Sequence, residues 1–156
     1  MAARQKEQDF RLECTVTHRL HTLSKLTDRL SQAAYLDATG IPLNEGRTLA
    51  AVGAFAPLSV NDLARLANLT KGQASRAAQT LVDQGLVHKQ SNAVDARGVV
   101  LTLTPQGQQL WRRLKGVIQA RNEEITACLD EAERRQFDGL LDRLVAHAMA
   151  SAGEEP

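Results

Sequence analysis

The sequence predicts a mainly α-helical fold with one small β-hairpin wing (α+β), in which long helices flank a winged helix-turn-helix. Two short helices with N-cap signals, separated by a tight turn, occupy residues 59–84. A β-rich pair of segments follows at residues 86–104, and long amphipathic segments lie on both sides. Two helices joined by a short turn form a helix-turn-helix, whose second member can lie in the major groove of DNA. We therefore expect a nucleic-acid-binding module.

Capping residues mark the ends of both short helices. Ser59 is a favourable N-cap residue, and Asp62 follows it three positions later. Thr70 repeats this signal, and Gln73 stands where the second partner of a capping box belongs. Gly85 occupies the position of a left-handed residue that ends a helix. These signals place the recognition helix at about residues 70–84.

The recognition helix combines an apolar face with a polar one. Small and aliphatic side chains form the face that should pack inward: Ala74, Ala77, Ala78, Leu81 and Val82. The opposite face carries side chains of the kinds that contact phosphates and base edges. We predict that the following residues bind DNA: Lys71, Gln73, Ser75, Arg76 and Gln79. For each of them singly, a solvated helix face without DNA contacts is the alternative.

Residues 86–104 are predicted to form the wing. The sequence is polar from His88 to Gly98 and then β-rich at Val99–Leu103, which is typical of a hairpin with a solvated tip. Arg97 is the predicted minor-groove contact, because arginine senses groove width and negative potential. Asp95 can orient the guanidinium of Arg97 by a charge-assisted pair. Alternatively, Asp95 and Arg97 only stabilise the hairpin.

Long helical segments flank this module. Apolar residues recur at spacings of three and four in residues 10–38, and residues 44–55 form a second, short helix. Beyond the wing, Thr104 as N-cap and Pro105 open a helical pair at residues 106–129 and 131–150. A small winged core cannot cover stripes of this length, so we expect some of them to pack against a second copy of the chain. An intramolecular helical bundle is the alternative.

Length and composition fit one domain. The 156 residues are 43% hydrophobic and include 19 basic and 18 acidic residues, for a net charge of +1. A charge near zero argues weakly against nucleic acid, but basic residues gather in the middle of the chain and acidic ones toward the C-terminus. We predict a single domain over residues 1–156, with residues 42–104 as the winged helix-turn-helix and residues 10–38 and 106–150 as dimerisation helices.

The sequence also argues against several other classes of protein. No apolar run approaches the roughly 20 residues that span a bilayer, so we expect no membrane partner. Cys14 and Cys128 are too few for a disulfide framework, which favours a reducing cytoplasm, and Cys128 is expected to be a small core residue. The four histidines lie in no recognisable nucleophile–base motif, so we expect no enzyme. A winged-helix adaptor that binds proteins instead of DNA is an alternative, and it would lack salt-dependent duplex binding.

Several short motifs resemble the MarR family of winged-helix transcriptional regulators. They are Leu63-Ala64-Arg65, Ser75-Arg76, the run from Leu81 to Val87, Asp95-x-Arg97 and Leu103-Thr104-x-x-Gly107. The resemblance covers nearly the whole chain in length and element order. It implies a homodimer whose two winged modules bind a palindromic operator in double-stranded DNA, usually as a repressor. It also implies release from DNA by a small ligand, often an aromatic acid, or by an oxidant.

The resemblance places a ligand pocket between the first helix, the second helix and the recognition module. Polar residues spaced by three and four are expected to share one side of the first helix: Cys14, His18, His21, Lys25 and Asp28. A small aromatic carboxylate would place its ring on apolar walls and its carboxylate on cations. We predict that it contacts His18, Arg19, His21 and Arg47. A solvated stripe beside a dimer seam is the alternative.

Cys14 allows two further readings. Cys14, His18 and His21 could share a helix face as metal ligands, but a closed zinc site wants four ligands and no nearby residue completes the set. We therefore predict no metal and no cofactor. In one branch of the resembled family, tyrosines hold a peroxide-sensing cysteine, and this chain has only Tyr35. A thiol-based redox sensor at Cys14 is thus the alternative to a ligand sensor.

Overall fold

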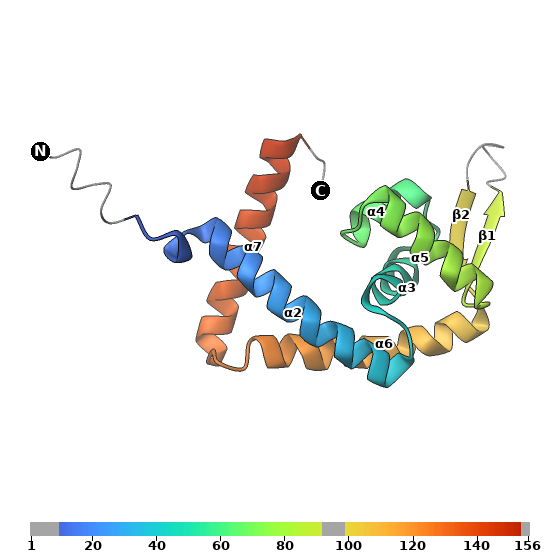
Figure 1. The fold of residues 1–156 in the computed structure, drawn as a ribbon, viewed down its shortest axis with the longest axis horizontal. Helices are drawn as coiled ribbons and strands as arrows, with labels where there is room; N and C mark the ends of the chain where they lie inside the picture. The colour runs from blue at the N-terminus through green and yellow to red at the C-terminus, as the bar shows by residue number, and fades with distance from the viewer. Residues whose placement is uncertain (1–9, 92–98, 154–156) are drawn as a thin grey trace, which may run out of the picture. The chain divides into compact units, whose positions relative to one another are not determined.

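The computed structural model describes residues 10–91 and 99–153. Its elements, in chain order, are η1 (Leu12–Cys14), α2 (Val16–Thr39), α3 (Leu43–Phe55), α4 (Val60–Leu66), α5 (Lys71–Asp83), β1 (Val87–Ser91), β2 (Val99–Leu103), α6 (Pro105–Ile125) and α7 (Glu131–Ala152). The fold is mainly helical with a two-stranded antiparallel hairpin, which confirms the predicted fold class (Figure 1). The chain divides into two compact units, Met1–Ile118 and Gln119–Pro156. The prediction of a single domain stays a prediction.

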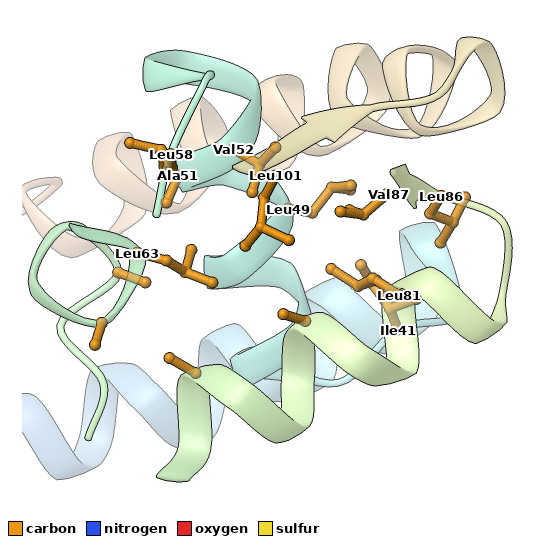
Figure 2. Close-up of a cluster of buried hydrophobic side chains, with 14 of the residues drawn as sticks. Ile41, Leu49, Ala51, Val52, Leu58, Leu63, Leu81, Leu86, Val87 and Leu101 are labelled. Carbon is orange, nitrogen blue, oxygen red and sulfur yellow. The ribbon is translucent and has the colours of Figure 1, made fainter. Parts of the chain in front are cut away.

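The core of the first unit is built around α3. Leu49 and Val52 of this helix are fully buried, and α3 packs against both α5 and β2. Figure 2 shows these two side chains beside Leu101 of β2, with Leu81 of α5 on another side of the same cluster. Each fully buried leucine stabilises the folded state by about 1.5–3 kcal/mol relative to an exposed one. The core therefore fixes the helix-turn-helix against the hairpin.

The hairpin is also anchored to the segment before α4. Its two strands pair antiparallel, with Val87 opposite Leu103 and Ser91 opposite Val99. Leu58 forms an isolated bridge to Leu101: the amide of Leu101 donates to the carbonyl of Leu58 at 2.8 Å, and the reverse bond is 3.3 Å. Because this bridge ties the chain just before α4 to β2, the wing and the helix-turn-helix share one backbone network.

The first long helix begins later than predicted. The sequence places its start near Phe10, whereas α2 begins at Val16 and Thr15 is its N-cap, accepting from the amide of His18 at 3.3 Å. Thr15 has an extended backbone (ψ 148°), and Leu12–Cys14 form a separate 3-10 turn. The reason is local: a threonine side chain that caps an amide three residues on competes with continuing the helix backwards. Cys14 therefore does not share a helix face with His18, and that prediction was wrong.

The second unit contains the end of α6 and the whole of α7. The helix predicted to run to residue 129 ends at Ile125, because the Arg134 guanidinium donates to the carbonyls of Thr126 (3.2 Å) and Leu129 (3.1 Å) in a tight turn. Such bonds satisfy carbonyls that a helix end leaves without partners. Asp130 then caps α7 in a capping box with Glu133. Cys128 lies in this turn and is exposed, so its predicted place in the core was wrong.

Candidate nucleic-acid interface

The first helix of the pair, α4, is positioned by its cap and its buried face. The amide of Asp62 donates to the Ser59 hydroxyl oxygen at 3.1 Å, and that hydroxyl donates to the Asp62 carboxylate at 2.6 Å. Leu63 and Ala64 are buried and hold the helix on the core. The turn that follows contains Asn68 in the left-handed region (φ 53°), which asparagine tolerates better than most residues. The predicted N-cap at Ser59 is confirmed.

The recognition helix α5 begins with the predicted capping box. The amide of Gln73 donates to the Thr70 hydroxyl oxygen at 3.2 Å, and the amide of Thr70 donates to Oε1 of Gln73 at 2.9 Å. Two backbone donors that a helix start leaves without partners are thereby satisfied. One consequence concerns the predicted DNA contacts: the oxygen of the Gln73 side chain already accepts one hydrogen bond from the backbone, which leaves its NH₂ group and one further acceptor position for another partner.

The inward face of α5 is made of small side chains. Ala74, Ala77 and Ala78 are at most 4% exposed, and Leu81 is fully buried. Alanines allow the backbone of α5 to approach α3 closely, and they leave the other side of the helix clear of the core. This confirms the predicted inward face. It turns the following side chains to the solvent: Lys71, Ser75, Arg76 and Gln79.

The exposed side chains of α5 differ in how they are held. Gln79 donates to the carboxylate of Asp83 at 2.8 Å, so it is drawn toward the C-terminal end of the helix. The Arg76 guanidinium reaches back over the first turn, where a Cβ on Gly72 would lie 3.5 Å from its Nη1 atom. A Cβ at this distance would make only an ordinary van der Waals contact with Arg76. The cations Lys71 and Arg76 and the hydroxyl of Ser75 therefore lie exposed on one helix.

The hairpin adds a cation that the sequence reasoning did not single out. Lys89, at the centre of β1, is exposed, as are His88 and Gln90. Only Val87 of β1 is buried. The strand therefore lacks the alternation of apolar and polar residues that would have marked an outward face in the sequence. The predicted wing residues Asp95 and Arg97 lie outside the described residues.

A clamp joins the recognition helix to α6. The Thr104 hydroxyl donates to the carbonyl of Gly85 at 2.7 Å and accepts from the amide of Gly107 at 3.0 Å. Gly85 has φ +70°, the left-handed conformation predicted for the residue after the helix. Thr104 therefore acts as the predicted N-cap of α6 and also fixes the end of α5. This explains physically why the run Leu103-Thr104-x-x-Gly107 suits a winged helix.

The predicted effector residues lie in two separate places. His18 and Arg19 are exposed on α2 and line a shallow hollow of about 280 Å³ together with Leu23 and Leu26. Arg47, on α3, instead donates to the carboxylate of Asp28 at 2.5 Å. His18 and Asp28 are separated by about 15 Å along α2, at 1.5 Å per residue. The structure therefore does not bring Arg47 together with His18 and Arg19.

The Arg47–Asp28 pair lies beside a buried tyrosine. Tyr35 is 8% exposed, and burial raises the pKa of its phenol, with Arg47 opposing the shift and Asp28 adding to it. Its ring packs against Gly46, where a Cβ would meet the ring carbon Cε2 at 2.6 Å. Glycine at this position thus allows α2 and α3 to approach closely. The ion pair closes the same helix–helix contact.

Among the described residues, Cys14 finds neither further metal ligands nor a tyrosine that could hold its thiol. No group of three or more histidine, cysteine, aspartate or glutamate side chains that could hold a metal ion occurs in residues 10–91 and 99–153. Cys14 is exposed, and Tyr35 lies near the other end of α2, about 28 Å along the helix from its first residue. Tyr35 therefore cannot hold the Cys14 thiol of its own chain. Over the same residues, no helix combines the length and apolar character needed to cross a membrane.

These features together define a winged helix-turn-helix protein: a pair of capped helices, a recognition helix with a buried alanine face, and a paired hairpin. Comparison with known proteins agrees. The sequence model of the MarR family matches residues 39–98. An HTH-type transcriptional repressor of Mycobacterium tuberculosis is 29% identical over 112 residues, which is 72% of this chain and 81% of that protein.

Solved structures share the fold. A MarR/EmrR family transcriptional regulator from Acinetobacter sp. ADP1 has a TM-score of 0.80 at 22% identity, covering 89% of this chain and 98% of that one. BpsR from Bordetella bronchiseptica, described as regulated in its DNA binding by 6-hydroxynicotinic acid, has a TM-score of 0.78 at 19% identity, covering 87% and 96%. Together the matches show that the chain is similar to winged-helix transcriptional regulators of the MarR family and shares their fold.

Proposed function

We propose that the chain is a ligand-responsive transcriptional repressor that binds a palindromic operator as a homodimer and is released by a small aromatic carboxylate. The observation that carries this proposal is the exposed polar face of α5, where Lys71, Ser75 and Arg76 stand opposite a buried alanine face. Side chains of these kinds contact phosphates and base edges in the major groove. The similarity to a mycobacterial repressor supports repression as the outcome. The role is not enzymatic.

Dimerisation is supported by apolar side chains that the described residues leave uncovered. On α2, Val16 is 66% exposed and Leu20 and Leu30 are each about half exposed. On α7, Phe137 and Leu144 are 38% and 56% exposed. Contiguous apolar patches of this extent on monomers mark interaction surfaces, and a second copy of the chain is the proposed partner. Two copies would present their recognition helices to half-sites roughly 34–36 Å apart.

The wing would supply the second groove contact. Arg97 is proposed to enter the minor groove, with Asp95 orienting its guanidinium. Lys89, exposed on β1, places a positive charge on the same hairpin. A helix alone offers few phosphate contacts in a chain whose net charge is +1, so binding needs both the wing and the second copy.

The proposed effector is a small aromatic carboxylate, and Arg47 is its proposed carboxylate contact. His18, Arg19 and His21 were predicted as further contacts, but His18 and Arg19 lie too far along α2 to contact the same small molecule within one chain. The compound in the description of BpsR, 6-hydroxynicotinic acid, belongs to this chemical class, which supports the proposal by fold likeness. Arg47 already binds a carboxylate, that of Asp28. An effector that engages Arg47 would therefore replace Asp28. As a DNA-binding regulator, the protein would act in the cytoplasm.

A redox-sensing repressor is the second candidate, because the Cys14 thiol is exposed. Peroxide treatment followed by duplex titration separates the two: a redox sensor loses affinity on oxidation and regains it on reduction, and Cys14→Ala removes the response. An aromatic-acid sensor shows no such loss. A protein-binding adaptor would bind no duplex even at low salt.

The experiment that tests the proposal is a fluorescence anisotropy titration with duplexes that tile the promoters of the chain's own gene and its neighbours. We expect at least one palindromic duplex to bind, with log affinity falling against log salt by about 0.9 for each phosphate neutralised. Arg76→Ala and Arg97→Ala should each weaken binding severely while the dimer stays folded. Arg135→Ala, on α7, is the matched control, because it removes only an exposed pair with Glu131. Affinity unchanged in Arg97→Ala would remove that residue from the interface, and the absence of any binding duplex would refute the function.

A further inference from the structure

A cavity of about 450 Å³ lies within the first unit, at the C-terminal end of the recognition helix. The end of α2, the residue that caps α5, the start of the wing and the first half of α6 bound it. It shares no residue with the predicted effector contacts on α2 and α3. Its volume falls in the range of about 300–1,000 Å³ that is usual for small-molecule sites.

The cavity has an apolar floor and a polar rim. Ile41 and Leu86, 4% and 5% exposed, form the floor together with the partly buried Leu110. The rim consists of exposed polar side chains: Gln84, Gln106, Gln109 and Arg113. A ligand would therefore rest a carbon skeleton on the floor and meet hydrogen-bonding groups around it.

The polar side chains of the rim have donors and acceptors that other described residues do not engage. Within residues 10–91 and 99–153, the side-chain amides of Gln84, Gln106 and Gln109 make no hydrogen bond, and Arg113 makes no ion pair. The single hydrogen bond of the Arg113 guanidinium is long, 3.5 Å from Nη1 to the carbonyl of Ala38. Guanidinium offers five donors, and each glutamine offers both donors and an acceptor.

We propose that this cavity binds a small carboxylate that carries several hydroxyl groups, of the sugar-acid class. Arg113 takes the carboxylate, because paired N–H donors of a guanidinium match the two oxygens of a carboxylate. The glutamine amides bind hydroxyl groups, which donate and accept in turn as the amides do. Ile41 and Leu86 cover the C–H face of the carbon chain. The three amides favour a ligand that carries several hydroxyl groups over a purely aromatic acid, because only the former gives each amide a group on the ligand to bind.

The location gives the site a consequence for the helix that is proposed to read DNA. Gln84 is the C-cap residue of α5, and Arg113 lies on α6. A ligand held by both would bridge these two helices next to the Thr104–Gly85 clamp. This regulatory consequence rests on the proposed function, whereas ligand binding itself does not.

Calorimetric titration of the full chain without DNA tests the site, with D-gluconate and D-glucuronate as the probes. We expect saturable binding of at least one. Arg113→Leu should raise its Kd by about tenfold or more, since hydrogen bonds to charged groups contribute about 1.5–3 kcal/mol. Arg112→Leu, the neighbouring exposed arginine outside the cavity, is the matched control and should leave Kd unchanged. Binding of neither probe, or equal weakening by both variants, would overturn the proposal.

Side-chain amide resonances provide a second measurement that does not depend on how well a variant folds. On addition of the bound sugar acid to the wild-type chain, the NH₂ signals of Gln84, Gln106 and Gln109 should shift, and that of Gln108 should not. Shifts confined to residues outside the cavity would overturn the assignment. Because no duplex is present, a failure of DNA binding leaves this result intact, and the two proposals can fail separately.

Discussion

Gly107 lies directly against the backbone carbonyl of Leu86, so that a Cβ at position 107 would overlap that carbonyl and come within 3.0 Å of its carbon atom. The contact joins the first turn of α6 to the residue that leads from α5 into the wing. The backbone cannot yield easily here, because Thr104 also accepts from the amide of Gly107 and donates to Gly85.

We predict that Gly107→Ala lowers the free energy of unfolding by about 1–3 kcal/mol, the range for overpacking that forces the backbone to move. Gly116→Ala is the matched control: it lies in the same helix with no atom within 4 Å of the added Cβ. It should stabilise the protein by up to about 1 kcal/mol, because alanine favours helices over glycine. Urea denaturation of both variants checks the prediction, and equal stabilities would contradict it.

Gln73 should act mainly as a cap of the recognition helix. Gln73→Ala removes the acceptor for the Thr70 amide and should cost about 1 kcal/mol of stability. Gln73→Glu keeps an acceptor there and should restore the stability, although a carboxylate at this place repels phosphate and should still weaken duplex binding. Thermal melts together with anisotropy titrations separate the two effects. If Gln73→Ala weakens DNA binding without loss of stability, base contact is its principal role.

The proposed aromatic effector must compete with the Asp28 carboxylate for the Arg47 guanidinium. The two side chains are 40% and 32% exposed, so the pair is worth no more than about 1 kcal/mol. Asp28→Asn should therefore tighten binding of benzoate or 4-hydroxybenzoate by up to about fivefold, because Arg47 no longer has a competing carboxylate. Arg47→Leu should abolish it. Calorimetric titration measures both, and benzoate binding unaffected by Arg47→Leu would remove Arg47 from the site.

The parts of this fold that sequence reasoning predicted depend on contacts within three or four residues. Ser59 with Asp62, and Thr70 with Gln73, are hydrogen-bonded pairs whose partners lie three positions apart, so spacing alone reveals them. Gly85 is similar, because its left-handed backbone follows from its place after a helix. The helix-turn-helix and the strands could therefore be placed before any tertiary contact was known.

The parts that were missed depend on distant residues or on competing local bonds. Gly107 and Leu86 are 21 positions apart in the sequence, and Arg47 and Asp28 are 19 apart. Residue spacing within a helix or turn therefore predicts neither contact. The start of α2 was misplaced because apolar residues recur on both sides of Thr15, while the N-cap that begins the helix is a single hydroxyl. The cavity at the C-terminal end of α5 joins Ile41, which follows α2, Gln84, which caps α5, and Arg113 in the first half of α6, and only the folded chain brings these residues together.

Tyr35 makes the α2–α3 contact sensitive to alkaline pH. Burial raises the pKa of its phenol above the usual value of 10.0, so the folded chain keeps its proton to a higher pH than the unfolded chain does. Below pH 10 both states are protonated and this contribution to stability is fully present. Above it the unfolded state ionises first, which favours unfolding, and the contribution is lost as the pH rises through the folded-state pKa. We therefore predict that stability falls above pH 10.

Because Tyr35 is the sole tyrosine in the chain, ultraviolet difference spectroscopy reports its ionisation without interference from another phenol. The phenolate signal should develop at higher pH in the native chain than in the chain unfolded in urea. Tyr35→Phe should make the stability less dependent on pH in this range, since it removes the ionising group and keeps the ring on Gly46. Coincident titrations of the native and unfolded chains would contradict the burial of this phenol, and with it the close α2–α3 contact that holds Arg47 beside Asp28.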